Sequence, residues 1–179
     1  PGVGTIATNV SKDGRLFKEF VTIKRNPKTP LWIVSTGSAV LGLGDIGHMG
    51  AGPVMEGKQG LFKGFGDVDA NILLVDTKGR TDVPNKVLTA VKELKEKYGD
   101  VIVMLEDIAA PECFEAERLL NESGIPTIHD DQHGTAVIIA AGVINALKIA
   151  KKEPGDARIV LVGAGASGAL TASVELGLD

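Results

Sequence analysis

Short apolar segments alternate with longer amphipathic stretches along most of the chain. Four of these segments have the length and composition of buried strands: 31–34, 72–75, 101–105 and 125–128. Three stretches have the character of helices: one that opens at Pro84, one near 111–121 and an apolar one over 136–150. Continuous apolar strands that alternate with helices are typical of a parallel sheet covered by helices. The pattern therefore predicts an α/β fold with a mostly parallel sheet.

The stretch that opens at Pro84 has the clearest helical periodicity. Val87, Val91, Leu94 and Tyr98 share one face, whereas lysines and glutamates occupy the other. By contrast, residues 1–30 are polar and mixed, and the region that follows the first strand is rich in glycine. The glycine-rich region covers 42–66, and the turn around 41–47, at its start, is expected to shape a pocket.

A polar segment near the end of the chain indicates a domain boundary. Residues 151–156 are charged and contain Pro-Gly, and an apolar segment over 158–162 follows them. That segment is predicted to be a strand leading through a glycine-rich turn into a helix, which is the start of a Rossmann-type dinucleotide-binding unit. Two domains are predicted, over 1–152 and 153–179. Both ends are expected to be cut from a longer chain.

The composition argues against nucleic acid and membranes as partners. Hydrophobic residues make up 44% of the chain, enough for a core, and the net charge of −4 offers no basic field to nucleic acid or an anionic membrane. The apolar run 136–150 is shorter than the roughly 20 residues of a membrane span, so it is interpreted as a buried helix. The single cysteine, Cys113, fits a reducing compartment, the cytoplasm, and is interpreted as a small buried group.

Two pairs of carboxylates follow predicted strands. Glu106 and Asp107 come after 101–105, and Asp130 and Asp131 come soon after 125–128. Because sites in parallel sheets gather outside the carboxyl ends of the strands, the pairs favour one shared divalent cation, Mg²⁺ or Mn²⁺. The alternative is helix and turn capping by the aspartates. The nearby His129 and His133 could also bind metal, although His129 is expected to have a structural role or to support the ligands.

A glycine-rich turn follows the predicted strand 158–162. Glycines at such a turn let the backbone approach a pyrophosphate, and the helix N-terminus attracts its charge. A tight strand-to-helix turn without a ligand is the alternative. The candidate cofactor-binding residues are Gly163, Ala164, Gly165, Ala166, Ser167 and Gly168.

Lys58 is a candidate base. It follows Gly57 in weakly charged, glycine-rich surroundings, where a lysine can lose its proton more readily than in water. Most lysines are solvated surface charges, and Lys63, only five positions on, illustrates that alternative.

Six segments, in this order and spacing, resemble malic enzyme in its short prokaryotic form, and the resemblance spans nearly the whole chain. The segments are Pro1-Gly2-Val3, Ala39 to Gly47, Pro53 to Lys58, Leu105 to Ile108, Ala110 to Phe114, and His129 to Ala136. The resemblance implies the N-terminal catalytic domain of that family followed by the beginning of its NAD(P)-binding domain.

The resemblance also implies a reaction. The family oxidatively decarboxylates L-malate to pyruvate and CO₂ with NAD or NADP and a divalent metal. By this resemblance Glu106, Asp107 and Asp131 match the metal ligands, with Asp130 beside them, and Lys58 matches the general base. Gly163, Gly165 and Gly168 match the cofactor turn. Family members usually form homodimers or homotetramers.

The chain departs from the family pattern in two places. The family's general acid is a tyrosine just before the Pro-Gly-Val turn, so it would precede Pro1, and Tyr98 on a predicted surface helix is a poor substitute. The 179 residues alone are therefore expected to be inactive. In the turn after the first strand, many relatives carry an aspartate in place of Ser35 or Thr36.

Three alternatives compete with this interpretation. A malolactic enzyme would use similar ligands and release lactate. A non-catalytic relative could bind dicarboxylate or nucleotide and regulate a partner, but it should have lost part of the metal set. A metal-independent amino-acid dehydrogenase would leave the paired carboxylates unexplained.

Overall fold

The computed structural model describes residues 2–23, 25–163 and 165–170. The chain divides into two compact units, Pro1–Ile128 and His129–Asp179. The division comes before the domain boundary predicted at 152, and that boundary stays a prediction.

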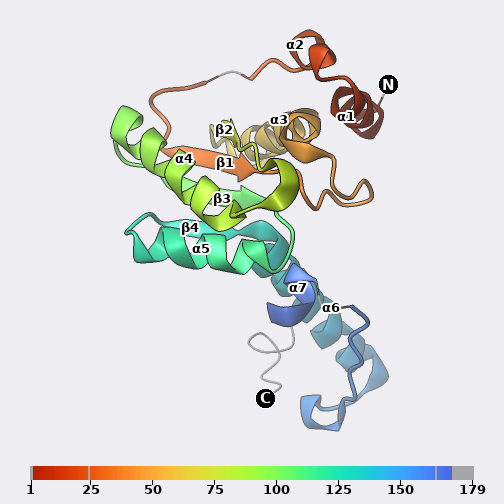
Figure 1. Cartoon of the computed structure of the whole chain (residues 1–179). Coiled ribbons are helices and arrows are strands. Elements are labelled where there is room, and N and C mark those ends of the chain that lie inside the picture. The colour runs from red at the N-terminus through yellow and green to blue at the C-terminus, as the bar shows by residue number, and fades with distance from the viewer. Residues whose placement is uncertain (1, 24, 164, 171–179) are drawn as a thin grey trace. The chain divides into compact units, whose positions relative to one another are not determined.

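The first unit is built on a parallel sheet (Figure 1). Its strands are β1 (Leu31–Ser35), β2 (Asn71–Leu74), β3 (Ile102–Glu106) and β4 (Thr127–His129), whose last residue begins the second unit. The strand order is β2-β1-β3-β4, and β1 pairs in parallel with both β2 and β3. All four predicted strands form, with ends that differ from the prediction by one or two residues. The predicted α/β class with a parallel sheet is therefore confirmed.

Helices cover both faces of this sheet. They are α1 (Val3–Lys12), α2 (Phe17–Phe20), α3 (Gly47–Gly66), α4 (Val83–Tyr98) and α5 (Glu112–Glu122), with short 3₁₀ turns at Gly14–Leu16 and Lys78–Arg80. Adjacent residues of β1 point to opposite faces. Trp32 packs against the ring of Tyr98 on α4, whereas Ile33 lies in a buried cluster with Met55 of α3. Figure 1 shows α4 and α5 side by side in front of the sheet.

The helix predicted from Pro84 is confirmed. Its apolar face buries Val83, Val87, Val91 and Leu94, and the lysines and glutamates of the opposite face remain in water. Periodicity identified α4 because its apolar positions recur every three or four residues, as burial of one helix face requires.

Helix α3 was not predicted. It occupies most of the glycine-rich stretch 42–66, a composition that disfavours an isolated helix. Close packing explains the glycines. A Cβ on Gly52 would lie only 2.6 Å from the ring of Phe17, and a Cβ on Gly50 would lie 3.0 Å from the Cβ of Ser11. The absent side chains allow α1 and α2 to approach α3, and the apolar area buried there outweighs the weak helix propensity.

The second unit contains α6 (Asp130–Ala150), a 3₁₀ turn at Pro154–Asp156 and α7 (Ala166–Leu170). The predicted apolar helix forms, but it begins six residues earlier, at Asp130, and it is not buried. Most of its apolar side chains are exposed, including Val137, Ile138 and Ile149. The prediction of a buried helix is therefore wrong. An apolar sequence makes burial of a helix favourable, but burial also needs other elements to pack on it, and the described residues do not provide them.

Among the described residues, α6 alone has the length and apolar composition of a membrane-spanning helix, a test that core helices of water-soluble proteins also pass. The predicted absence of a membrane segment stays a prediction.

The strand predicted over 158–162 does not form. These residues have irregular backbone, and Val160 and Val162 are almost fully exposed. A strand gains its stability from hydrogen bonds to a neighbouring strand, and within the described part of the second unit no strand pairs with this segment. An apolar, β-branched sequence is therefore not enough to form a strand here without a sheet to join.

Candidate functional site

The carboxyl ends of three strands meet at one edge of the first unit's sheet. The parallel register places Ser35 of β1 opposite both Leu74 of β2 and Glu106 of β3. The chain runs from β1 to β2 on one side and later returns to place β3 on the other side. This order creates a topological switch point between β1 and β3, where open parallel sheets bind their ligands.

Lys58 and Glu106 meet at this switch point. Lys58 projects from α3, and its Nζ lies 2.8 Å from Oε1 of Glu106, the last residue of β3. Glu106 is 4% exposed, whereas the lysine side chain is partly open to solvent. A buried carboxylate is costly unless a cation or hydrogen bonds compensate it, so the pair stabilises the charge at the end of β3. Two residues proposed separately from the sequence are thus in direct contact.

Asp107 continues the strand end in an unusual backbone conformation. Its φ is 54°, in the left-handed region that few residues other than glycine adopt, and it is 7% exposed. Its carbonyl accepts a hydrogen bond of 3.1 Å from the amide of Ala39. Such local strain persists only where surrounding contacts impose it, and it is frequent at functional sites.

Buried hydroxyls join the loop after β1 to the loop after β3. Ser38 Oγ accepts a 2.9 Å hydrogen bond from the amide of Ala109 and lies 2.9 Å from Oγ1 of Thr36. Thr36 and Ser38 are 1% and 8% exposed. Sequence reasoning did not identify Ser38, and it treated Thr36 only as a departure from the family. Short side chains in a turn give no sequence signal for a partner some 70 residues away along the chain.

A cavity of about 470 Å³ adjoins this edge of the sheet. Asp45, Ile46 and Gly47 form part of its wall, so the predicted pocket-shaping role of the turn 41–47 is confirmed. Gly37 is essential to this arrangement. Its carbonyl accepts the amides of Ile46 and Gly47, its φ is 68°, and a Cβ there would overlap the carbonyl of Gly47.

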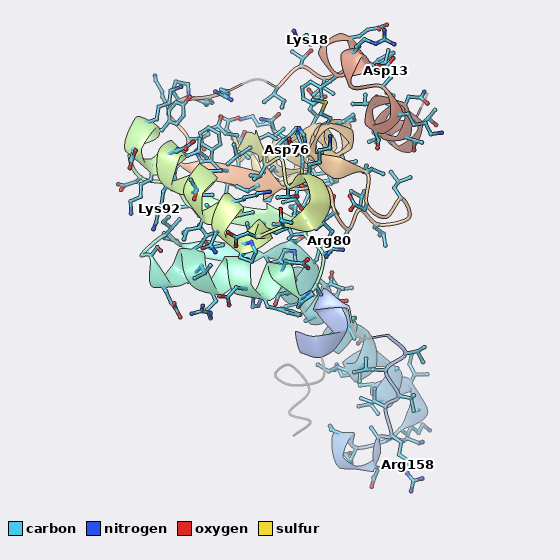
Figure 2. The ribbon with its side chains drawn as sticks, viewed as in Figure 1. Asp13, Lys18, Asp76, Arg80, Lys92 and Arg158 are labelled. Carbon is cyan, nitrogen blue, oxygen red and sulfur yellow. The ribbon has the colours of Figure 1, made fainter. Side chains whose placement is uncertain are left out.

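The opposite wall of the cavity comes from the segment after β2. Asp76 and Arg80 of this wall are labelled in Figure 2. Asp76 Oδ1 lies 3.5 Å from His48 Nδ1 at the start of α3. Arg80 donates to both carboxylate oxygens of Glu112, at 2.7 and 2.6 Å, which fastens this segment to α5. The cavity wall therefore includes the start of α3 and the segment after β2, and Arg80 links that segment to α5.

In the second unit, the acidic pair forms the first turn of α6, where carboxylates complement the helix dipole. Asp131 Oδ2 lies 3.1 Å from His129 Nε2, and His129 Nδ1 lies 2.9 Å from the side-chain nitrogen of Gln132. The imidazole thus orients the Asp131 carboxylate while Gln132 fixes the ring. This is the supporting arrangement expected for His129.

The three candidate metal ligands lie on two units, Glu106 and Asp107 on the first and Asp131 on the second. Across the described residues, no group of three or more histidine, cysteine or carboxylate side chains is gathered closely enough to hold a metal. Buried adjacent carboxylates at a strand end nevertheless fit a hard dication, which prefers oxygen ligands.

The predicted cofactor turn is only partly described. Gly163 has a φ of 108°, and a Cβ on Gly168 would lie 3.0 Å from the carbonyl oxygen of Gly163, so the turn is tight. Gly165 precedes α7, and Ala166 and Ser167 begin it, whereas Ala164 lies outside the described residues. The helix of the motif is present, and the preceding strand is not.

Two other residues lie away from the candidate site. Tyr98 packs on Trp32 near the amino end of β1, opposite the edge that carries Glu106, so it cannot act on a ligand there. Cys113 is completely buried in α5, as predicted for a small core residue.

Known proteins share this chain's sequence and fold. Residues 1–121 match the family model for the malic enzyme N-terminal domain. An NAD-dependent malic enzyme of Geobacillus stearothermophilus is 48% identical, over 94% of this chain and 33% of its own length. A bifunctional malic/malolactic enzyme of Bacillus subtilis is 45% identical, over 94% of this chain and 39% of its own.

Structural similarity agrees with these matches. The crystal structure of an NAD-dependent malic enzyme from Thermotoga maritima superposes with a TM-score of 0.73 at 38% identity, covering 99% of this chain and 45% of that one. The chain spans only 33% and 39% of the length of the two curated relatives. Sequence and fold together establish that the chain belongs to the malic enzyme family.

Proposed function

We propose that the protein containing this chain converts L-malate to pyruvate and CO₂, with reduction of NAD or NADP and a requirement for Mg²⁺ or Mn²⁺. The contact between Lys58 and Glu106 at the switch point carries the proposal. It joins a candidate base to a candidate metal ligand at the edge of the sheet where ligands bind. Membership of the malic enzyme family supports the choice of substrate and of a nicotinamide cofactor.

Lys58 acts as the base in this proposal. The amine in its neutral form would accept the proton of the malate C2 hydroxyl, and a bound NAD or NADP would supply the acceptor for the C2 hydride. Glu106 holds the amine in place through the 2.8 Å contact, and α3 provides a rigid support. A positioned base of this kind gains its rate advantage from orientation as well as basicity.

Glu106, Asp107 and Asp131 are the proposed metal ligands. The first two are fixed by β3 and its loop, and the third is oriented by His129. When bound, the dication supplies Lewis-acid stabilisation of negative charge on the C2 oxygen during loss of the β-carboxylate. Asp130 would support these ligands, and the turn from Gly163 to Gly168 would approach the cofactor pyrophosphate.

The proposal extends to assembly and location. We expect a homodimer or homotetramer in the cytoplasm, without nucleic acid or membrane partners. The net charge of −4 supports the absence of nucleic acid partners, and the single, fully buried cysteine supports a reducing compartment. Size-exclusion chromatography with light scattering measures the assembly directly.

The test of the reaction uses the full-length protein with L-malate, Mn²⁺ and either NAD⁺ or NADP⁺, with and without a chelator. We expect reduction of one nicotinamide, abolished by the chelator, with an equal amount of pyruvate formed. Reduction that persists in the chelator would overturn the metal requirement. Absence of any product would leave a binding or regulatory role.

A malolactic activity is a second candidate because one relative is named a bifunctional malic/malolactic enzyme. Lactate formed from malate without accumulation of reduced nicotinamide would establish it. The same incubations, assayed for both acids, distinguish the two reactions.

A further inference from the structure

The backbone segment that carries Asp107 is held from both sides by the loop after β1. On one side, the amide of Ala39 donates to the Asp107 carbonyl at 3.1 Å. On the other, the amide of Ala109 donates to the Ser38 hydroxyl at 2.9 Å. The two bonds come from consecutive residues and enclose the position whose φ is 54°.

This clamp opposes an intrinsic backbone preference. Aspartate adopts the left-handed region more often than most non-glycine residues, but a negative φ remains its ordinary conformation. If the segment were free, Asp107 would relax toward a negative φ, and the direction of its Cα–Cβ bond would change. The interloop hydrogen bonds therefore fix the direction in which the Asp107 side chain leaves the backbone.

Ser38 is the side-chain member of the clamp, and Thr36 controls Ser38. Their hydroxyl oxygens lie 2.9 Å apart, and both residues are buried. Because Ser38 Oγ already accepts from Ala109, its own proton can be donated to Thr36 Oγ1. The chain of bonds runs from Thr36 through Ser38 to the backbone beside Asp107.

We propose that Ser38, held by Thr36, is a positioning residue that sets the orientation of the Asp107 carboxylate for metal binding. The inference rests on the proposed role of Asp107 as a metal ligand. Groups that orient metal ligands typically change metal affinity by about 10–100-fold when they are removed. Neither hydroxyl needs to contact the metal or the substrate for this effect.

The test is Ser38→Ala in the full-length protein, with Ser38→Thr as the variant that keeps the hydroxyl and Ser123→Ala as a control at the exposed end of α5. The dissociation constant for Mn²⁺ is measured from the electron paramagnetic resonance signal of the free ion. We expect Ser38→Ala to weaken binding by at least about tenfold. Ser38→Thr and Ser123→Ala should remain within about twofold of the unchanged protein.

Two further readouts separate positioning from general loss of structure. Hydrogen exchange at the Ala109 amide should accelerate in Ser38→Ala, because that amide loses its acceptor. In turnover, the Mn²⁺ concentration for half-maximal activity should rise while kcat at saturating Mn²⁺ changes little. If Ser38→Ala does not fold, Thr36→Val against Thr36→Ser applies the same comparison, since valine keeps the shape of threonine without its hydroxyl.

The outcomes distinguish this inference from the proposed function. If the unchanged protein binds no Mn²⁺, the metal site itself is overturned, and the inference with it. If the unchanged protein binds Mn²⁺ and Ser38→Ala binds it equally well, only the positioning role fails. Unchanged exchange at Ala109, or a loss of kcat with unaltered metal affinity, would also overturn it.

Discussion

Lys58 on α3 and Glu106 at the end of β3 form an ion pair, with Nζ 2.8 Å from Oε1. The pair lies at the switch point of the parallel sheet and brings together the candidate base and the first candidate metal ligand. Its carboxylate is buried, so its environment differs from that of exposed ion pairs, which contribute little to stability.

Replacement of Lys58 by alanine should lower kcat for malate oxidation by about 10²–10⁴-fold, the usual contribution of a positioned base. Affinity for Mn²⁺ should be retained or increased, because the substitution removes a cation that competes for Glu106. Steady-state formation of reduced nicotinamide and a metal titration measure the two effects.

Lys63→Ala is the matched control for Lys58→Ala. Lys63 lies on the same helix but is exposed and pairs with Asp67 and Asp69. Its removal should leave kcat unchanged. Near-normal turnover in Lys58→Ala would show that another group takes the proton.

Gly37→Ala should destabilise the first unit. Its left-handed φ costs an alanine about 1–2 kcal/mol, and the new Cβ would also overlap the Gly47 carbonyl. Gly42→Ala separates these effects, because Gly42 also has a positive φ but has open space around it. Denaturant unfolding should show a larger loss for Gly37→Ala, and equal losses would argue against a steric role for the Gly47 contact.

Gly52→Ala and Gly60→Ala should change stability in opposite directions. A Cβ at Gly52 would lie 2.6 Å from Phe17, and overpacking of this kind costs about 1–3 kcal/mol. Gly60 faces open space on the same helix, so alanine there should stabilise the protein by about 0.5–1 kcal/mol through helix propensity. Thermal unfolding of both variants tests the packing explanation for α3. Stabilisation by both substitutions would contradict it.

The pKa of the Tyr98 phenol should be lower than that of an ordinary tyrosine. Partial desolvation raises the pKa of the Tyr98 phenol, but interactions with Lys97 and Arg25 together outweigh it and hold the pKa below 10.0. Since the folded pKa is lower than the unfolded one, the stabilising contribution appears as pH rises through the folded pKa and is complete above 10.0. Phenolate absorbance, taken as the difference from Tyr98→Phe, gives the midpoint. Arg25→Met should raise this midpoint, and an unchanged value would exclude the contribution of the guanidinium.

The sequence was most informative where one physical requirement dominates. The face of α4 that carries Val87 and Val91 is buried as its periodicity predicts, because a surface helix must cover one stripe of apolar residues. The sequence was misleading where the structure of a segment depends on a neighbouring element. The segment 158–162 has strand composition, yet it remains irregular because no strand within the described part of its unit offers hydrogen bonds.

The candidate site shows the same division. The sequence by itself determined that Glu106 and Asp107 follow a buried strand, because continuous apolar residues between turns identify such a strand. Only the tertiary structure placed Lys58 against Glu106 and Ser38 against Ala109, and only packing made a helix of the glycine-rich stretch. Local patterns report which face of an element must be buried. Contacts between distant segments depend on sheet register and helix approach, which no single segment encodes.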